Sequence, residues 1–315
     1  MPDAVHPPSD LHALARLLKA GEVAAFPTET VYGLGADAGN PDAVLKIYET
    51  KGRPRFNPLI VHCADHAMAE MLADFSPMAR RLAEQFWPGP LTLVLPKREG
   101  ARLSDIVTAG LDTVGVRVPD HPLALALIRA AGVPLAAPSA NPSGRLSPTT
   151  AEQVRRAFGE SVPVLDGGPC TAGVESTILA VDGDAVVQLR TGALARDEIV
   201  RFLGRPGAIA AEDSPIAAPG MLASHYAPKA QLRLNAAGLE PGESYLAFGQ
   251  TAISATSGLL NLSPSGDLRE AARNLFSMLH ELDRGQGGIA VAPIPDEGLG
   301  EAINDRLRRA AAPRS

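Results

Sequence analysis

The chain of 315 residues is 45% hydrophobic and 20% charged, a composition typical of a globular protein with one large or two ordinary domains. Its formal net charge of −6 and sequence pI near 5.7 mean that the surface as a whole repels nucleic acid, so a polyanion has to be held at a local basic site. No apolar run approaches the ~20 residues that cross a bilayer, and two cysteines without CxxC spacing exclude a thiolate zinc site and a disulfide scaffold.

Helical and strand patterns alternate along the first two hundred residues. The first residues, 1–10, lack the charged and apolar regions of a signal peptide, so we expect a cytoplasmic protein without membrane contact. Periodicity predicts helices over 10–20, 40–48, 66–72, 77–86, 123–131, 147–158 and 196–203. Apolar runs predict strands over 23–26, 59–63, 91–95, 113–118, 133–137, 162–165, 176–181 and 185–189. This interleaving favours an α/β fold, with a twisted, open, mixed sheet covered by helices.

The pattern changes after residue 204. Residues 205–228 are rich in Ala, Pro, Ser and Gly, as expected of a linker. After the linker, strands predicted over 231–234, 244–248 and 288–293 and helices over 267–282 and 297–312 indicate a smaller Rossmann-like α/β unit. We therefore expect a first domain over 1–204, a linker over 205–228 and a second domain over 229–315. The basic end of the last helix suits the helix dipole, and we favour this structural interpretation over nucleic-acid binding.

A basic segment lies just before the predicted strand at residue 59. Lys51, Arg53 and Arg55 place three cations within five residues. Because an unpaired cation costs several kcal/mol to desolvate, these side chains have to stay in water, meet carboxylates or meet a ligand's phosphates. Two prolines stiffen the segment, which reduces the entropy lost on binding an anion. Arg suits forked recognition of phosphate or carboxylate and Lys adds a point charge; a solvated basic turn is the alternative.

The best-known nucleotide motifs are absent or weak. The chain contains no GxxxxGK[ST], GxSxG or HExxH, so it lacks the signatures of P-loop proteins and of the best-marked hydrolases. Residues 33–38 match GxGxxA after a strand. In a dinucleotide fingerprint the helix begins within the motif, whereas here the helix signal waits until Asn40-Pro41. A nicotinamide or flavin site is therefore disfavoured.

Hydroxyls, cations and an amide recur in loops at the predicted strand ends, where ligands bind in open α/β sheets. Each one alone has a structural explanation, such as a helix cap for Ser147, a turn for Asn141 or a core position for His62. Their joint recurrence, with few carboxylates among them, favours a cavity for anions. The set comprises Thr28, Thr30, Lys51, Arg53, Asn57, His62, Arg117, Ser139, Asn141, Ser143, Ser147, Ser176, Thr177 and Arg190.

Seven motifs carry a resemblance to a known family. They are FPTETVYGLG at 26–35, the KGR loop through the histidine at 51–62, WPGPLT at 87–92, VRVP at 116–119, APSAN at 137–141, GVEST at 173–177 and LRTG at 189–192. With these motifs the chain resembles the threonylcarbamoyl-AMP synthase family, which prepares the threonylcarbamoyl group placed on adenosine beside the anticodon of tRNA. The KxR and SxN signatures are both intact. PGM at 219–221 and HYAP at 225–228 resemble the linker of the long, two-domain form.

The resemblance implies an L-threonylcarbamoyladenylate synthase, a nucleotidyltransferase that takes ATP, L-threonine and bicarbonate with Mg²⁺ and hands its product to the tRNA threonylcarbamoyl transferase complex. It assigns Thr30, His62, Arg117, Ala137 and Ser176 to L-threonine. It assigns Arg53, Asn57, Thr113, Ser139, Ser147, Arg190, His225 and Tyr226 to ATP. It assigns catalytic roles to Lys51, Arg53, Ser139 and Asn141, with Lys51 near bicarbonate. No acidic pair suggests a protein cage for Mg²⁺, so we expect the ion to ride on the triphosphate.

The linker is a candidate lid. The carbamate and the acyl-adenylate both react with water, so the cavity has to close during turnover. Gly220 permits bending, and His225 or Tyr226 can cover the nucleotide; a passive tether is the alternative. The second domain shows no catalytic signature, and we expect it to regulate closure or to contact a partner.

Two other functional classes stay open. A tRNA or double-stranded RNA binder would use the same basic concavity, and a weak contact with such RNA is compatible with the enzyme, although the acidic pI and the threonine-sized constellation disfavour a dedicated RNA binder. A carbamoyl transferase of metallocentre maturation uses a similar domain. It should also bring zinc-finger cysteines, which two lone cysteines exclude, and an acyl-phosphatase segment.

Overall fold

The computed structural model describes residues 10–211, 218–219, 225–251, 253, 258–285 and 287–313. Its first sheet contains β1 (Ala24–Phe26), β2 (Gly33–Asp37), β3 (Ile60–His62), β4 (Leu91–Pro96), β5 (Thr113–Arg117), β6 (Leu135–Ala136), β7 (Thr177–Asp182), β8 (Ala185–Arg190) and β9 (Ala208–Ile209). Its second sheet contains β10 (Leu232–Arg233), β11 (Ser244–Ala247), β12 (Leu259–Asn261) and β13 (Ile289–Val291). Gly220, where we expect the linker to bend, lies outside the described residues.

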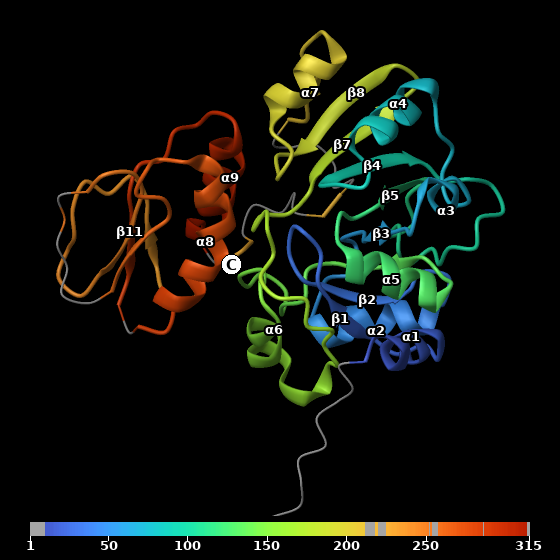
Figure 1. Cartoon of the computed structure of the whole chain (residues 1–315), viewed down its shortest axis with the longest axis horizontal. Helices are drawn as coiled ribbons and strands as arrows, with labels where there is room; N and C mark the ends of the chain where they lie inside the picture. Colours follow the sequence, from blue (N-terminus) through green and yellow to red (C-terminus); the bar gives the residue numbers. More distant parts are fainter. Residues whose placement is uncertain are drawn as a thin grey trace, which may run out of the picture.

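The two sheets differ in strand direction. The first has the order β1-β2-β6-β3-β5-β4-β7-β8-β9; its pairs β3–β5, β4–β7 and β8–β9 are parallel and its other neighbours are antiparallel. The second has the order β10-β13-β11-β12 and is parallel in every described pair. A mixed α/β sheet followed by a smaller α/β unit is thus confirmed (Figure 1).

Helices connect most of the strands. Those of the first unit are α1 (Leu11–Lys19), α2 (Pro41–Lys51), α3 (His66–Glu70), α4 (Pro77–Phe86), α5 (Pro122–Ala131), α6 (Ala151–Phe158) and α7 (Arg196–Leu203), and those of the second are α8 (Leu268–Leu282) and α9 (Leu299–Ala311). A 3-10 turn over Gly159–Ser161 follows α6.

Helix α2 sets the position of the basic segment. Asn40 caps it by accepting hydrogen bonds from the backbone N–H groups of Asp42 and Ala43, which satisfies donors that the first turn leaves free. The helix ends at Gly52, whose φ of 59° is the left-handed value that favours glycine. Lys51 is therefore the last residue of a helix rather than part of a flexible loop, and its side chain starts from a fixed point.

Two local expectations were wrong, and three strands were not predicted. Residues 33–37 form β2, an unpredicted strand whose glycines leave room for a neighbouring ring: a Cβ at Gly35 would lie 2.7 Å from Cε1 of Phe26. Residues 162–165 form no strand and contribute only a single bridge between Ala25 and Val164. Helix α6 begins at Ala151 because Thr150 and Gln153 form its capping box, so the predicted cap at Ser147 is not used. Strands β9 and β12 were not predicted.

The second unit packs on the first through its helices. Figure 1 shows α8 and α9 between the second sheet and the loops of the first unit. Val31, Leu146 and Val174 of the first unit share one buried cluster with Leu275 and Phe276 of α8. The two units therefore bury part of their apolar surface against each other.

Candidate active site

A cavity lies at one edge of the first sheet, where β3, β5 and β8 end and β7 begins. His62 and Arg117 are the last residues of β3 and β5, Arg190 is the last residue of β8, and Ser176 directly precedes β7. Because these strand ends meet at the same edge, four motifs far apart in the sequence converge there, as expected for a ligand site in an open sheet. The cavity is lined by Thr28, Thr30, Val31, Gly33, Arg53, Ile60, His62, Arg117, Ala137, Pro138, Ser139, Glu175, Ser176, Arg190, Pro219, His225 and Tyr226.

Most of the predicted site residues line this cavity, and five do not. Those in the lining are Thr30, Arg53, His62, Arg117, Ala137, Ser139, Ser176, Arg190, His225 and Tyr226. Three of these five lie behind the lining and bond to it. Lys51 donates to the backbone oxygen of Ser139, the backbone oxygen of Asn57 accepts from Arg53, and Ser147 donates to Glu175. Asn141 lines a neighbouring pocket, and its backbone oxygen accepts a hydrogen bond from Lys51. Thr113 is the first residue of β5, at the end opposite Arg117, and is not in the lining.

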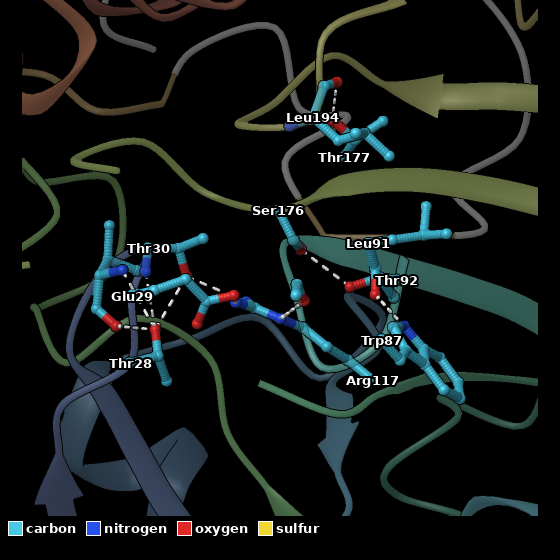
Figure 2. A network of polar contacts seen from close by, with 12 residues as sticks. Thr28, Glu29, Thr30, Trp87, Leu91, Thr92, Arg117, Ser176, Thr177 and Leu194 are labelled. Atoms are coloured by element: carbon cyan, nitrogen blue, oxygen red, sulfur yellow. Dashed lines mark hydrogen bonds and ion pairs between the residues drawn. The ribbon is translucent and has the colours of Figure 1, made fainter. Parts of the chain in front are cut away.

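One side of the cavity is a polar network centred on Arg117 (Figure 2). The guanidinium forms an ion pair with Glu29 at 2.5 Å and donates to Oγ1 of Thr30 at 2.9 Å and to the carbonyl oxygen of Gly89 at 3.1 Å. Two nitrogens of the fork are thus held by hydrogen bonds and the third, Nη2, by the ion pair alone, because Nη2 is buried without a hydrogen-bond partner among the described residues. The side chain is therefore fixed before any ligand arrives and keeps donor capacity for one. Oγ1 of Thr30 is also 2.8 Å from Oγ1 of Thr28.

His62 is a neutral side chain in the cavity wall. Burial, reinforced by the nearby positive charge of Arg117, lowers the pKa of His62 to about 3. Its Nδ1 atom is buried and has no hydrogen-bond partner among the described residues. A buried, unsatisfied ring nitrogen costs free energy, which a ligand hydroxyl or amine would recover. Neutral His62 suits hydrogen bonding rather than charge pairing.

Lys51 and Arg53 are buried, whereas Arg55 is exposed to water as expected. In the described part of the chain, backbone carbonyl groups rather than water or salt-bridged carboxylates surround the two buried cations, which corrects part of the expectation. Lys51 donates to the backbone oxygens of Ser139 and Asn141, and Arg53 donates to the backbone oxygens of Asn57 and Pro58. Burial, together with Arg53, lowers the pKa of Lys51 well below its usual value, and burial lowers the pKa of Arg53 to about 10. The carbonyl groups hold both cations in place without neutralising them.

The opposite wall contains Arg190 and the segment at residues 225–226. Arg190 donates to the backbone oxygen of Ser176 at 2.8 and 3.1 Å and to that of Pro219 at 3.0 Å. The rings of His225 and Tyr226 are 4.0 Å apart, and both side chains are buried. Tyr226 has a φ of 62°, an uncommon value for a bulky residue. The aromatic end of the expected lid therefore lies against the cavity.

Two carboxylates at the site, Glu29 and Glu175, were not predicted from the sequence. Glu175 lines the cavity and binds Ser147 and Arg306, while Glu29 binds Arg117 behind the lining. Both lie inside motifs that the resemblance rests on, each next to a predicted hydroxyl, and that position was the signal that could have identified them.

The charges of the site leave an excess of cations. Each carboxylate forms a salt bridge with one arginine, so the two pairs are formally neutral. Among the described residues, no carboxylate forms a salt bridge with Lys51, Arg53 or Arg190. Three buried basic side chains therefore face or support one cavity without a salt-bridged carboxylate, which suits a site for a polyanion.

The described residues contain no group of three or more His, Cys, Asp or Glu side chains placed to hold a metal ion. The carboxylates at the cavity are committed to arginines, so the donor set does not form a protein cage for Mg²⁺. In the same described part of the chain, no helix is long and apolar enough to cross a membrane.

Comparisons with known proteins identify the family of the chain. A family model described as telomere recombination (Sua5, YciO and YrdC) matches residues 16–192, and a model described as the C-terminal domain of threonylcarbamoyl-AMP synthase matches residues 188–312. The chain is 44% identical to the threonylcarbamoyl-AMP synthase of Bacillus subtilis (strain 168), over 95% of this chain and 92% of that protein. It is 41% identical to that of Pyrococcus abyssi, over 94% and 92%. The crystal structure of P. abyssi Sua5 complexed with L-threonine superposes with a TM-score of 0.87 at 40% identity, covering 96% of this chain and 94% of that one.

Proposed function

The chain belongs to the threonylcarbamoyl-AMP synthase family, and we propose that it is the enzyme which condenses L-threonine, bicarbonate and ATP to threonylcarbamoyl-AMP and pyrophosphate. The observation that carries the proposal is the convergence of Lys51, Arg53 and Arg190, without salt-bridged carboxylates, on one buried cavity. A carbamate, a carboxylate and a triphosphate repel one another, so a protein that joins them has to supply fixed positive charge.

The reaction has two steps that balance without an oxidant or reductant. The amine of threonine and bicarbonate give a carbamate and water. A carbamate oxygen then attacks the α-phosphorus of ATP, and the bond to the β-phosphate breaks to release pyrophosphate. Such a nucleotidyl transfer depends on positioning and on charge stabilisation. Fixed charges at a developing oxyanion are worth about 3–4 kcal/mol, roughly 10²–10³ in rate.

The Arg117 side of the cavity suits L-threonine, the ligand in the crystal structure of the P. abyssi relative. The fork of Arg117 can meet the carboxylate, and Nδ1 of His62 is an unsatisfied partner for the hydroxyl. Thr30, Ala137 and Ser176 complete this wall. The small Ala137 leaves room for the methyl group of the substrate.

The Arg53 and Arg190 side suits the nucleotide, and Ser139 also lines the cavity. Lys51 reaches the loop that carries Ser139 and Asn141 from the end of α2, which favours a role close to bicarbonate and the reacting phosphate. His225 and Tyr226 line the same cavity, which supports a lid that excludes water. In this scheme Mg²⁺ enters the site bound to the triphosphate of ATP, so the protein itself does not have to hold the ion.

The product is destined, under this proposal, for the tRNA threonylcarbamoyl transferase complex in the cytoplasm. RNA binding as the primary function has little support, because the cations that would serve it are buried: Arg53, Arg117 and Arg190 are 8%, 3% and 7% exposed, and a duplex presents its phosphates on a broad surface.

Product analysis tests the proposal. The full-length protein is incubated with ATP, L-threonine, Mg²⁺ and ¹⁴C-bicarbonate, and products are separated while pyrophosphate is quantified. We expect a labelled adenylate and stoichiometric pyrophosphate that both require threonine. Pyrophosphate release that does not depend on threonine, or labelled product without AMP, would refute it.

A further inference from the structure

Glu175 connects the cavity to the last helix of the chain. One carboxylate oxygen accepts a hydrogen bond from Oγ of Ser147 at 2.5 Å, and the other accepts one from Nε of Arg306 at 2.7 Å. Glu175 lines the cavity, whereas Arg306 belongs to α9 of the second unit. A residue 131 positions later in the chain thus holds a carboxylate in the wall of the site.

Arg306 is buried, and each nitrogen of its guanidinium has a hydrogen-bond partner. Its side chain is 1% exposed, and its other nitrogens donate to the carbonyl oxygen of Thr191 at 2.9 Å and to Asp305 at 2.6 Å. Its guanidinium lies 5.1 Å from the ring centre of Tyr226, within cation–π distance. Burying an arginine this completely costs several kcal/mol unless its partners are well placed, so the arrangement is specific rather than incidental.

Glu175 is charged although it is buried. Burial alone raises the pKa of a carboxyl, but Arg306 and Arg190 together with the bond from Ser147 lower the pKa of Glu175 below its usual value. A negative charge in this wall opposes the binding of a triphosphate. With Arg306 beside it, the pair is close to neutral, and Arg53 and Arg190 determine the sign of the potential that the ligand meets.

We propose that Arg306 is a positioning residue of the active site, which holds and neutralises Glu175 so that anionic nucleotide meets a cationic wall. Through Arg306 the second unit contributes to the reaction. This proposal rests on the proposed function, because it takes the ligand to be a nucleoside triphosphate. It also refines the expectation that the second domain regulates closure or contacts a partner: the domain supplies one half of a charge pair at the cavity.

The test compares nucleotide affinity in four forms of the full-length chain: wild type, Arg306→Met, Glu175→Gln and the double variant. Binding of a non-hydrolysable ATP analogue with Mg²⁺ is measured by calorimetry at pH 8. We expect Arg306→Met to weaken binding at least tenfold, about 1.4 kcal/mol, because it removes the salt-bridged partner of Glu175 and leaves only Arg190 to offset the carboxylate. We expect Glu175→Gln to bind as tightly as wild type or more tightly, and the double variant to return to within threefold of wild type.

Arg308→Met is the matched control on the same helix, because Arg308 is exposed and its contact with Asp296 spans 3.7 Å; it should bind like wild type. A double variant as weak as Arg306→Met would overturn the proposal, since Arg306 would then matter only for packing. Tight binding by a folded Arg306→Met protein would do so too. If Arg306→Met does not fold, Glu175→Gln decides: a tenfold loss of affinity contradicts the proposal and unchanged or tighter binding supports it. Affinity is measured without turnover, so the result stands apart from whether threonylcarbamoyl-AMP is made.

Discussion

Arg117 and Glu29 form a 2.5 Å ion pair in which the two side chains are 3% and 8% exposed. The pair fixes one end of the arginine fork, while Thr30 and the backbone of Gly89 fix the remaining nitrogens. A rigid, desolvated arginine loses little entropy when it binds a carboxylate.

Replacing Arg117 by Lys should therefore impair threonine use specifically. The single ammonium cannot reproduce a fork held at three nitrogens, so we expect the KM for threonine to rise at least tenfold while the KM for ATP stays within threefold. Steady-state kinetics measure both. Arg102→Lys, at an exposed position, serves as the control. An equal rise in both KM values would mean that the two subsites are not separate.

Lys51→Met should lower kcat. Lys51 donates to the backbone oxygens of Ser139 and Asn141, so its loss removes a charge and releases the loop that faces the reacting groups. We expect kcat to fall by roughly 10²–10³, the range for one preorganised charge. Lys46→Met on the same helix removes a pair with Glu22 and a hydrogen bond to the backbone oxygen of Gly21, neither of which belongs to the cavity lining, and should leave kcat unchanged. A fall in kcat of less than tenfold for Lys51→Met would show that Lys51 has no catalytic role.

His62→Leu should reduce the choice of threonine over valine. Nδ1 of His62 is an unsatisfied partner for the substrate hydroxyl, and a site group left unpaired by valine penalises valine, by up to about 10⁴ in favourable cases. The leucine variant loses this penalty, so we expect the ratio of kcat/KM for threonine to that for valine to fall at least tenfold. An unchanged ratio would assign hydroxyl recognition to another residue.

Acid should destabilise the fold through two histidines. Burial lowers the pKa of His62 and of His225 to about 3, whereas the unfolded side chains take up protons below about pH 6.5. Their stability contribution is complete above pH 6.5 and is lost as pH falls towards 3, by about 1.4 kcal/mol per pH unit for each histidine.

Urea unfolding at pH 7.5, 6 and 5 measures this loss. The variant His62→Gln removes one titrating group, so the slope of unfolding free energy against pH should be about 1.4 kcal/mol per unit shallower below pH 6. Identical slopes in the variant and the wild type would show that His62 does not stay neutral in the folded protein.

Gly173→Ala should destabilise the protein more than backbone strain alone would, because it also disturbs the packing of the two units. Gly173 has a φ of 76°, and a Cβ there would lie 2.4 Å from the backbone oxygen of Ala272 in α8. Strain of about 1–2 kcal/mol adds to overpacking of about 1–3 kcal/mol. Gly183→Ala, with a φ of 55° and nothing within 4 Å, carries the strain alone. The thermal midpoint should fall clearly further for Gly173→Ala; equal shifts would contradict close packing of α8 on this loop.

Sequence patterns identified most elements because capping residues and apolar runs act locally. Asn40 before Pro41 predicted the start of α2, and a polar residue at each strand end predicted much of the cavity lining. The failures depend on contacts that are distant in sequence. Strand β2 lacks a strand pattern because its glycines make room for the ring of Phe26, and Ser147 resembles a helix cap although it binds Glu175.

The role of the last helix could not be read from its sequence for the same reason. Arg306, Arg308 and Arg309 are similar in pattern and fit the helix dipole. The structure separates them: Arg308 is exposed, whereas Arg306 is buried against Glu175. Whether a cation on a helix faces water or a distant carboxylate is decided by tertiary packing.

The cluster that joins Val31, Leu146 and Val174 to Leu275 and Phe276 limits how the chain can be shortened. Truncation at residue 205 would remove α8 and leave apolar side chains of the first unit facing solvent, so lost activity in such a fragment would report aggregation as readily as a missing lid. A soluble short form would need polar replacements at residues 31, 146 and 174 before its chemistry could be compared with that of the whole enzyme.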